Sequence, residues 1–365
     1  MLAAAIVFTA AACEPKQEAP QIPIGVQLYS VRWDLENDFY GTLKAVKELG
    51  YDGVEFAGLY GNTPEQVKQW CEEIGLTPIS AHVPLADMLA DIDQVISDYK
   101  TIGCEYIAVP YVTEERRPDG ELFLQMVDEI AAIALKVSDA GMTLLYHNHD
   151  FEFKKYEDQY GLDYLYGNID ADLLQTELDL CWVKYAGEDP AQYLLKYADR
   201  SPVVHFKDYY FEAAEGEQGD PYALIGIDKK DERPSTFEFR PMGCGLQDVP
   251  ALLEAYRQAG SKWIIVEQDQ PSMDFTPMEC IGISVKHLKH LISCEGCPCC
   301  HECDSSGKCD KCKHECDSCD KCKHECDSCD KCQKDGCDKC DNSKKACEEG
   351  GCSESDCAGC SDCAK

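Results

Sequence analysis

Short apolar runs rich in β-branched and aromatic residues alternate with amphipathic stretches along most of the chain. The apolar runs have six to eight residues, and the stretches between them repeat their apolar positions with helical spacing. This pattern predicts eight strands, at residues 24–31, 53–58, 78–83, 104–111, 143–148, 174–180, 203–208 and 263–269. It also predicts helices, several of which close on glycine, at residues 41–50, 64–75, 122–141, 190–198, 249–260 and 277–292.

Strands that alternate with helices form a parallel sheet, and eight such units in about 270 residues match the usual size of a (β/α)₈ barrel. A doubly wound open sheet is the competing architecture, but no glycine-rich phosphate loop follows the first predicted strand. We therefore predict an α/β protein with a (β/α)₈ (TIM) barrel as its catalytic domain over residues 24–292. In this fold the active site lies at the C-terminal ends of the strands.

An uncharged apolar segment precedes the predicted barrel. Residues 2–12 are too few to span a bilayer as a helix, and Cys13 follows them directly. Small residues before a cysteine resemble a bacterial lipoprotein signal, although no Lys or Arg precedes the run. The alternative, an apolar element of the fold, is opposed by Pro15 and Pro20, which separate the segment from the first predicted strand. We predict a signal over residues 1–13 with lipidation at Cys13, a linker over 14–23, and an exported protein, periplasmic or on the surface, that is anchored in the membrane by this lipid.

The C-terminal tail, residues 293–365, has a different composition and holds 20 of the 26 cysteines. It has almost no aliphatic or aromatic side chains, so its order must come from crosslinks or bound metal. A ten-residue unit repeats with the spacing Cys-x₂-Cys-x₂-Cys-x₃-Cys, which suits Zn or Cu(I) in the manner of a metallothionein, whereas oxidation in pairs would give disulfides. The candidate metal or disulfide residues are Cys309, Cys312, Cys316, Cys319, Cys322, Cys326, Cys329 and Cys332.

The net charge narrows the choice of partners. Of the formal charge of −34, the tail accounts for −7, which leaves −27 on residues 1–292. Because nucleic-acid binding relies on Lys and Arg neutralising phosphates, we expect no nucleic-acid partner and no direct binding to an anionic membrane surface. A hydrophobic fraction of 44% is sufficient for a large core.

Polar residues stand at the ends of several predicted strands, where the barrel would bring them together. His147, Asp179, His205 and Glu267 fall on the last four strands. One buried His or Asp is more often structural than a ligand, but four on consecutive strands form a mixed nitrogen and oxygen set. Such a set suits one divalent ion of Mn, Co, Zn or Fe better than Mg or Ca.

Several motifs resemble the xylose isomerase-like barrel superfamily, which includes sugar phosphate isomerases/epimerases, inosose dehydratases and ketose 3-epimerases. The motifs are TLLYHNHDFEF at 143–153, LDLCWV at 178–183, VVHFKD at 203–208 and IIVEQDQ at 264–270, with GVEF at 53–56 and SAHVP at 80–84. The resemblance implies one metal held by Glu, Asp, His and Glu, of which Asp179, His205 and Glu267 match. His147 stands where relatives carry the first Glu, and Glu152 is the other possible source of that ligand.

The resemblance implies a sugar isomerase or epimerase that removes a proton next to a carbonyl and stabilises a metal-bound enediolate. We expect Glu267 to act with a second acid/base group drawn from His149, Glu152 and Lys207. The His147-Asn148-His149 pattern is similar to that of inosose dehydratases, so the alternative is a lyase that eliminates from a 3-keto-glycoside or an inosose. A non-catalytic sugar- or metal-binding lipoprotein is a third hypothesis.

A small-molecule carbohydrate is therefore the expected substrate. We expect Glu55 and His82 to hold its hydroxyls and Tyr29 and Trp182 to form a wall for the ring. Residues 209–242 would form a loop over the mouth, in which Arg240 either binds an anionic group or is merely solvated. The DNA-repair endonucleases of the superfamily are a poor match, because the body is acidic and Trp182 replaces one of their histidines.

Overall fold

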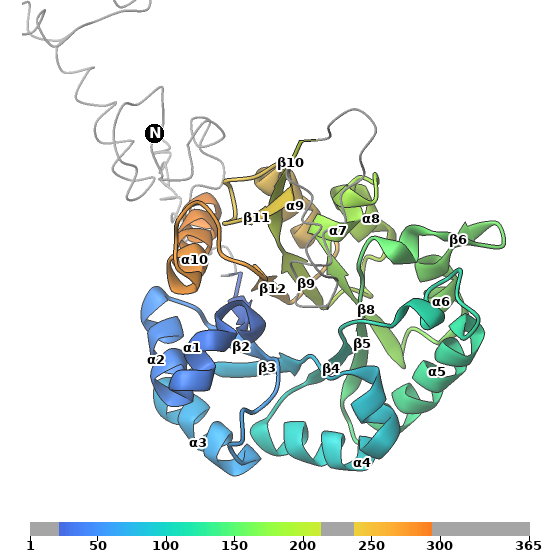
Figure 1. The fold of residues 1–365 in the computed structure, drawn as a ribbon, viewed down its shortest axis with the longest axis horizontal. Helices are drawn as coiled ribbons and strands as arrows, with labels where there is room; N and C mark the ends of the chain where they lie inside the picture. Colours follow the sequence, from blue (N-terminus) through green and yellow to red (C-terminus); the bar gives the residue numbers. More distant parts are fainter. Residues whose placement is uncertain (1–21, 213–236, 294–365) are drawn as a thin grey trace, which may run out of the picture. The chain divides into compact units, whose positions relative to one another are not determined.

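A barrel of eight parallel strands forms the centre of the protein. The computed structural model describes residues 22–212 and 237–293. The barrel strands are β1 (Ile24–Gln27), β2 (Gly53–Phe56), β3 (Thr77–Ala81), β4 (Tyr106–Val109), β5 (Thr143–His147), β8 (Leu174–Asp179), β9 (Val203–Phe206) and β12 (Trp263–Val266). They pair in the order β3-β2-β1-β12-β9-β8-β5-β4, and a bridge between His82 and Ala108 joins the two outermost strands (Figure 1). The predicted TIM barrel is confirmed, and every predicted strand is present.

Helices surround the strands in the order expected for repeated βα units (Figure 1). They are α1 (Arg32–Asn37), α2 (Phe39–Leu49), α3 (Pro64–Ile74), α4 (Leu85–Ile102), α5 (Phe123–Asp139), α6 (Gly161–Asn168), α7 (Leu180–Tyr185), α8 (Pro190–Lys196), α9 (Val249–Gln258) and α10 (Pro277–Ser293). Three short 3₁₀ turns, η1 (Leu28–Val31), η2 (Glu114–Arg116) and η3 (Phe151–Phe153), follow β1, β4 and β5. Helices α1, α4, α6 and α7 were not among the predicted helices.

Local sequence signals set the ends of α3. The Thr63 hydroxyl accepts a hydrogen bond from the backbone nitrogen of Gln66 at 3.3 Å, and the Gln66 side chain accepts one from the backbone nitrogen of Thr63 at 3.0 Å. This reciprocal cap leaves fewer unpaired donors in the first turn, and Pro64 suits the first helical position because its missing N–H is not needed there. The helix ends at Gly75, whose φ of 78° is a left-handed conformation that glycine adopts without strain.

The inward faces of the strands change from apolar to polar along the barrel axis. Ile79, Tyr106, Leu145, Val203 and Ile265 belong to one buried apolar cluster inside the barrel. Two residues further along β5, β9 and β12 the same face carries polar side chains, because side chains on a strand alternate between its faces. The polar residues of the site therefore lie at the C-terminal ends of the strands, directly above this apolar cluster.

The connection after β9 begins and ends as an antiparallel hairpin, not as the loop expected over residues 209–242. Strand β10 (Asp208–Phe211) pairs with β11 (Phe237–Arg240), and Asp208 is opposite Arg240. The alternation of aromatic residues explains this pairing, because Tyr209, Phe237 and Phe239 pack on Cys181 and Trp182 in a second buried cluster. A smaller hairpin, β6 (Lys155–Tyr156) with β7 (Gln159–Tyr160), follows η3.

Several predictions concern residues outside the described ranges. These are the signal with Cys13, most of the linker, and the tail with its cysteines from Cys309 to Cys332. Within the described ranges, Cys71, Cys104, Cys181, Cys244 and Cys280 form no disulfide, and the first three and the last are buried. None of the helices described is long and apolar enough to cross a membrane.

Candidate active site and metal centre

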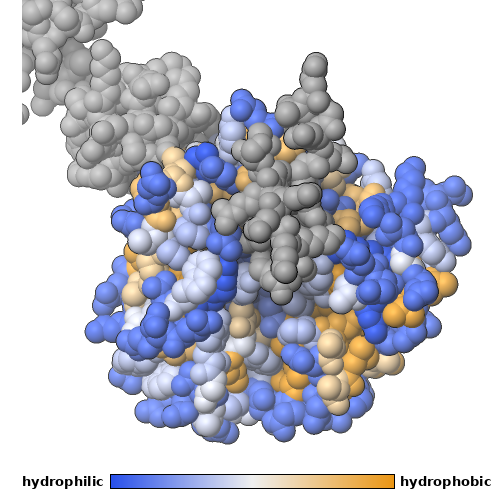
Figure 2. All heavy atoms as spheres, in the orientation of Figure 1, coloured by the Kyte–Doolittle hydropathy of each residue, from blue (hydrophilic) through white to orange (hydrophobic). Residues whose placement is uncertain are grey.

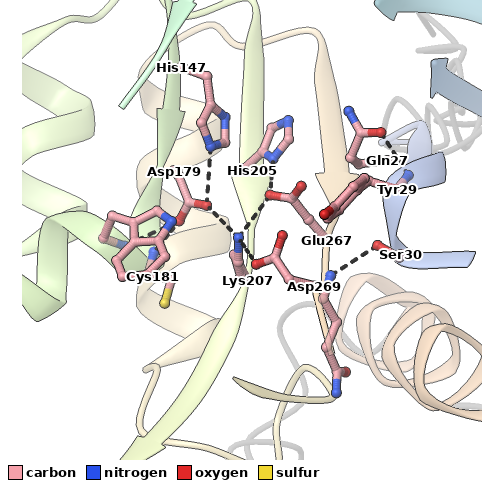
Figure 3. Close-up of polar contacts among 12 residues, drawn as sticks. Gln27, Tyr29, Ser30, His147, Asp179, Cys181, His205, Lys207, Glu267 and Asp269 are labelled. Carbon is pink, nitrogen blue, oxygen red and sulfur yellow. Dashed lines mark hydrogen bonds and ion pairs between the residues drawn. The ribbon is translucent and has the colours of Figure 1, made fainter. Parts of the chain in front are cut away.

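The four predicted metal ligands meet at the C-terminal ends of neighbouring strands. His147 ends β5, Asp179 ends β8, His205 lies on β9, and Glu267 follows β12 (Figure 3). One ligand atom from each lies within 4.8 Å of the others, and all four side chains are buried. The distance from His147 Nε2 to Asp179 Oδ2 is 3.7 Å, and that from His205 Nδ1 to Glu267 Oε2 is 3.1 Å.

The start of α7 orients Asp179. Its Oδ1 accepts hydrogen bonds from the backbone nitrogens of Cys181 at 2.8 Å and Trp182 at 3.2 Å, so the carboxylate caps the helix. Its Oδ2 then points into the cluster, where it is buried and makes no hydrogen bond, with Lys207 Nζ at 3.6 Å. Buried polar atoms normally have partners, and a cation among these four side chains would satisfy the carboxylate oxygen. The residues therefore fit a divalent metal, and two nitrogen and two oxygen donors suit the borderline transition metals.

A second layer of polar residues lies deeper in the barrel, and our sequence analysis missed its member Glu177. His147 Nδ1 lies 3.3 Å from Glu177 Oε2, and His205 Nε2 lies 2.8 Å from Glu55 Oε1. His82 Nε2 bridges the two carboxylates, at 2.6 Å from Glu177 and 3.0 Å from Glu55. Carboxylates on the second ring nitrogen are the usual means of orienting a metal-binding histidine. Period-two alternation could have identified Glu177, because it lies two residues before Asp179 on the same face of β8.

Glu55 is held in this deeper layer and not at the mouth where a substrate hydroxyl would lie. Its Oε1 accepts a hydrogen bond from Gln27 Nε2 at 2.7 Å, and its Oε2 accepts one from the Ser80 hydroxyl. It is fully buried and does not line the pocket above the cluster. The structure thus places Glu55 behind His205, as a partner of the ligand.

Lys207 lies among three carboxylates. Its Nζ is 2.5 Å from Asp269 Oδ2, 3.0 Å from Glu267 Oε2 and 3.6 Å from Asp179 Oδ2 (Figure 3). Asp269 is a second residue that our sequence analysis did not select, although it is two residues beyond Glu267 in the same alternating pattern. The ammonium group therefore connects the two carboxylate ligands of the predicted metal site.

The two other predicted acid/base candidates lie in different surroundings. The His149 ring stacks on Phe151 at 5.3 Å between centroids and contacts the rings of Tyr111 and Trp182. Glu152 lies apart from the four ligands, because its Oε1 accepts from the Tyr146 hydroxyl and its Oε2 from the His149 backbone nitrogen, both at 2.8 Å. Of the two alternatives for the first ligand, only His147 is part of the described cluster.

A pocket of about 860 Å³ opens above the cluster. The predicted residues that line it are Tyr29, His82, His147, His149, Lys207 and Glu267. Trp182 is fully buried in the aromatic cluster behind His149 and does not form the expected ring wall. Arg240 is not in the lining either, because it lies on β11 and pairs with Glu238 at 2.7 Å.

The family model described as "Xylose isomerase-like TIM barrel" matches residues 43–291. The chain belongs to this family. An inosose dehydratase of Geobacillus kaustophilus is 24% identical over 277 residues, which cover 68% of this chain and 86% of that protein. An inosose dehydratase of Lacticaseibacillus casei is 28% identical over 157 residues, 43% of this chain and 49% of the relative. The resemblance predicted from the strand motifs is thus confirmed.

Solved structures of similar fold agree with membership of the xylose isomerase-like family. A sugar phosphate isomerase/epimerase from Parabacteroides distasonis has a TM-score of 0.58 at 20% identity and covers 74% of this chain and 98% of its own. A probable 3-DHS dehydratase from Bacillus anthracis has a TM-score of 0.58 at 13% identity, with coverage of 74% and 99%. Likeness at these identities extends to the fold alone.

Burial and close charges shift the pKa values of this xylose isomerase-like centre in opposite directions. Burial and the adjacent Glu55 raise the pKa of Glu177 to about 7, although His82 and His205 oppose the rise. Burial lowers the pKa of His82, but Glu55 and Glu177 outweigh it and raise the value to about 10. The deeper layer therefore holds one firmly cationic imidazole and one carboxyl that readily takes a proton.

Among the residues that line the pocket, the pKa shifts keep His149 neutral and keep Lys207 and Glu267 charged. Burial, together with the nearby Lys207, holds the pKa of His149 well below its ordinary value, so the ring is neutral. Burial opposes the charge on Lys207, but Asp269, Glu267 and Asp179 raise its pKa well above the ordinary value. Burial raises the pKa of Glu267, but Lys207 and His205 outweigh it and lower the value. Groups with such divided protonation states in one pocket are typical of acid/base chemistry.

Proposed function

We propose that the protein is a divalent-metal-dependent sugar isomerase or epimerase, which removes a proton from a carbon next to a carbonyl group. The observation that carries the proposal is the buried set of His147, Asp179, His205 and Glu267 beneath a pocket that also exposes His149 and Lys207. Membership of the xylose isomerase-like family supports a small sugar or sugar-like substrate. The acidic body supports an uncharged ligand over a nucleic acid.

The four ligands would hold one ion of Mn, Co, Zn or Fe. Such an ion would supply Lewis acidity toward a carbonyl oxygen of the substrate. The chain fixes the ligands in advance, because Asp179 caps α7 and the deeper Glu177 and Glu55 lie against His147 and His205. Residues held in this way need little rearrangement when substrate binds.

Side chains at the floor of the pocket would remove the proton from the substrate carbon and return it. The His149 imidazole is neutral, faces the pocket and is held between aromatic rings, so it can accept a proton from carbon. Protonated Lys207 can donate a hydrogen bond to a substrate oxygen that gains negative charge, and ionised Glu267 is the second base. Return of the proton to the opposite face gives an epimer, and return to the neighbouring carbon gives an isomer. Glu152 has no such position, since it lies outside the pocket lining.

Elimination is the second candidate, and one specific observation favours it. The acid/base groups at the floor are an imidazole, an ammonium and a carboxylate, not the pair of metal-binding glutamates on opposite faces that a symmetric epimerisation uses. The inosose dehydratase relatives point the same way. A leaving group on the carbon beside the carbanion could depart with a proton from Lys207, which would make the enzyme a lyase for a 3-keto-glycoside or an inosose.

The test combines metal analysis with isotope exchange. The full chain, loaded separately with Mn, Co, Zn and Fe, is incubated with ketoses, an inosose and 3-keto-glucosides in D₂O and followed by NMR. Deuterium incorporation without loss of a group supports the isomerase or epimerase, and release of water or an aglycone supports the lyase. We expect Asp179→Asn to lose both the ion and the exchange, and the exposed Asp128→Asn to keep both. Retention of the ion by Asp179→Asn, or absence of exchange with every substrate, would remove the basis of the proposal.

Two further proposals rest on the sequence alone. We propose that Cys13 carries a lipid, which incorporation of labelled fatty acid into the chain, and its loss in Cys13→Ser, would test. We also propose that the tail cysteines bind Zn or Cu(I). Thiol titration with and without a chelator tests this, since equal titres would favour disulfides or free thiols over metal thiolates.

A further inference from the structure

The pocket has two unlike sides. Four polar residues, His149, Lys207, Glu267 and Asp269, follow the ends of β5, β9 and β12. Another part of the lining comes from the segments that follow β3 and β4 and from the start of α4, and six of its side chains are apolar: Val83, Pro84, Leu85, Leu89, Pro110 and Val112. We call these six residues the apolar flank. Figure 2 shows apolar residues gathered on the side of this face where α4 and α5 lie.

The first turn of α4 is built to present this flank. Asp91 has non-helical φ and ψ of −156° and 77°, so the turn before it is set off from the rest of the helix. The Asp91 Oδ1 atom accepts a hydrogen bond from the backbone nitrogen of Gln94 at 3.0 Å and thus caps the second part. Leu85 and Leu89, four residues apart, lie on one face of the part of α4 before Asp91. Leu89 is 43% exposed. An apolar side chain contributes favourable free energy only when its surface is removed from water, so a ligand that covers Leu89 would gain affinity from it.

The same pocket offers poor support for a phosphate group. Among the described residues of its lining, the basic ones are Lys207, Arg116 and His82, whose imidazole is held between Glu55 and Glu177. Lys207 is already surrounded by Asp179, Glu267 and Asp269, and Arg116 pairs with Glu129. Asp87 adds a further negative charge to the lining. A dianionic phosphate would therefore enter a site in which each basic side chain of the lining is already paired with a carboxylate.

We propose that the apolar flank binds an apolar substituent of the substrate. This inference rests on the proposed function and specifies its substrate class: an uncharged sugar that carries an aryl or alkyl group, such as a keto-glycoside with an apolar aglycone, and not a sugar phosphate. The reacting carbon lies over the polar side, and the aglycone lies against Leu85 and Leu89. The pocket volume of about 860 Å³ is within the range of sites for ligands larger than a monosaccharide.

Binding measurements on the full chain test the inference without requiring turnover. The probes are methyl and phenyl β-D-glucopyranoside and glucose 6-phosphate, titrated by calorimetry or ligand-observed NMR. We expect the phenyl glucoside to bind roughly tenfold more tightly than the methyl glucoside, which corresponds to burial of part of the ring. Glucose 6-phosphate should bind no more tightly than the methyl glucoside.

Two leucine variants locate the effect. Leu89→Asn should reduce the phenyl preference to roughly threefold or less, whereas Leu124→Asn should keep it, because Leu124 is 47% exposed in the first turn of α5 and does not line the pocket. Equal affinity for the two glucosides, tighter binding of the phosphate, or an unchanged preference in Leu89→Asn would overturn the inference. A Leu89-dependent preference without deuterium exchange on any keto-sugar would sustain this binding site and refute the proposed reaction. Exchange without the preference would do the reverse.

Discussion

Replacement of Glu177 by glutamine separates the role of the deeper layer from that of the ligands. Glu177 Oε2 lies 3.3 Å from His147 Nδ1 and 2.6 Å from His82 Nε2, and the side chain is fully buried. Glutamine keeps the shape but removes the negative charge that orients and polarises His147. Loss of such an outer carboxylate typically lowers metal affinity by about 10- to 100-fold. We expect this loss in Glu177→Gln, although the variant retains all four predicted ligands.

In the metal-free protein, Glu177→Gln should instead stabilise the fold. Burial beside Glu55 raises the pKa of Glu177 from 4.5 to about 7, so its ionisation costs the folded state about 3 kcal/mol above pH 7. Because Glu177 has the higher pKa in the folded state, its protonated form stabilises the fold. This stabilisation is complete below pH 4.5 and is lost as the pH rises to about 7. The neutral amide cannot ionise, so Glu177→Gln should flatten this part of the pH dependence.

The assay has two parts on the same samples. Competition with a chromogenic chelator gives metal affinity at about pH 7.5, and urea unfolding of the chelator-stripped protein from pH 4.5 to about 8 gives stability across the range in which Glu177 titrates. The exposed Glu72→Gln on α3 is the control and should match the wild type in both. Unchanged metal affinity in Glu177→Gln, or an apo stability that falls with pH as steeply as in the wild type, would refute the reasoning.

Three other changes have expected outcomes. His149→Gln should lower deuterium exchange by about 10²- to 10⁴-fold, as expected for loss of a general base, while metal analysis finds the ion retained. Lys207→Met removes the cation among Asp179, Glu267 and Asp269 and should destabilise the metal-free protein by about 3–5 kcal/mol in urea unfolding, with part of the loss restored by metal. Gly53→Ala places a Cβ 2.6 Å from the Thr77 carbonyl oxygen and should cost about 1–3 kcal/mol of stability without affecting metal content at saturation, and an unchanged midpoint would contradict the tight β2–β3 contact.

The sequence pattern predicted the barrel and its strand ends well, because period-two alternation and helical spacing are local properties. The same pattern places Asp179, His205 and Glu267 together, since parallel strands end at one rim. Pairing across a long insertion is not local, which is why the β10–β11 hairpin was expected as a loop. The aromatic residues that hold it, Tyr209 and Phe237, meet Trp182 only after the chain has folded.

The site residues were harder to predict where a role depends on side-chain direction. Trp182 follows a ligand strand, as a ring wall would, yet the cap of α7 turns it toward Phe237 and Phe239. Glu152 is close to His147 in sequence, but its hydrogen bond from the Tyr146 hydroxyl takes it to the other face of β5. Glu177 was missed for a simpler reason. Ligands of a barrel enzyme are expected at the strand ends, and Glu177 lies one layer below them.

The deeper layer also gives a physical reason for histidine at position 147. A glutamate there would lie beside Glu177, in a barrel interior that already holds Glu55, Glu177, Asp179, Glu267 and Asp269. Against these five carboxylates stand Lys207 and His82, whose pKa values are raised, and the divalent ion that we propose, which together would neutralise four. One negative charge is then left over, and Glu177, which lies 3.3 Å from His147 Nδ1, is placed to carry it. Neutral His147 would therefore supply a ligand without adding a further negative charge to this acidic interior. That is a physical reason for histidine at a position where the resemblance to relatives implies glutamate.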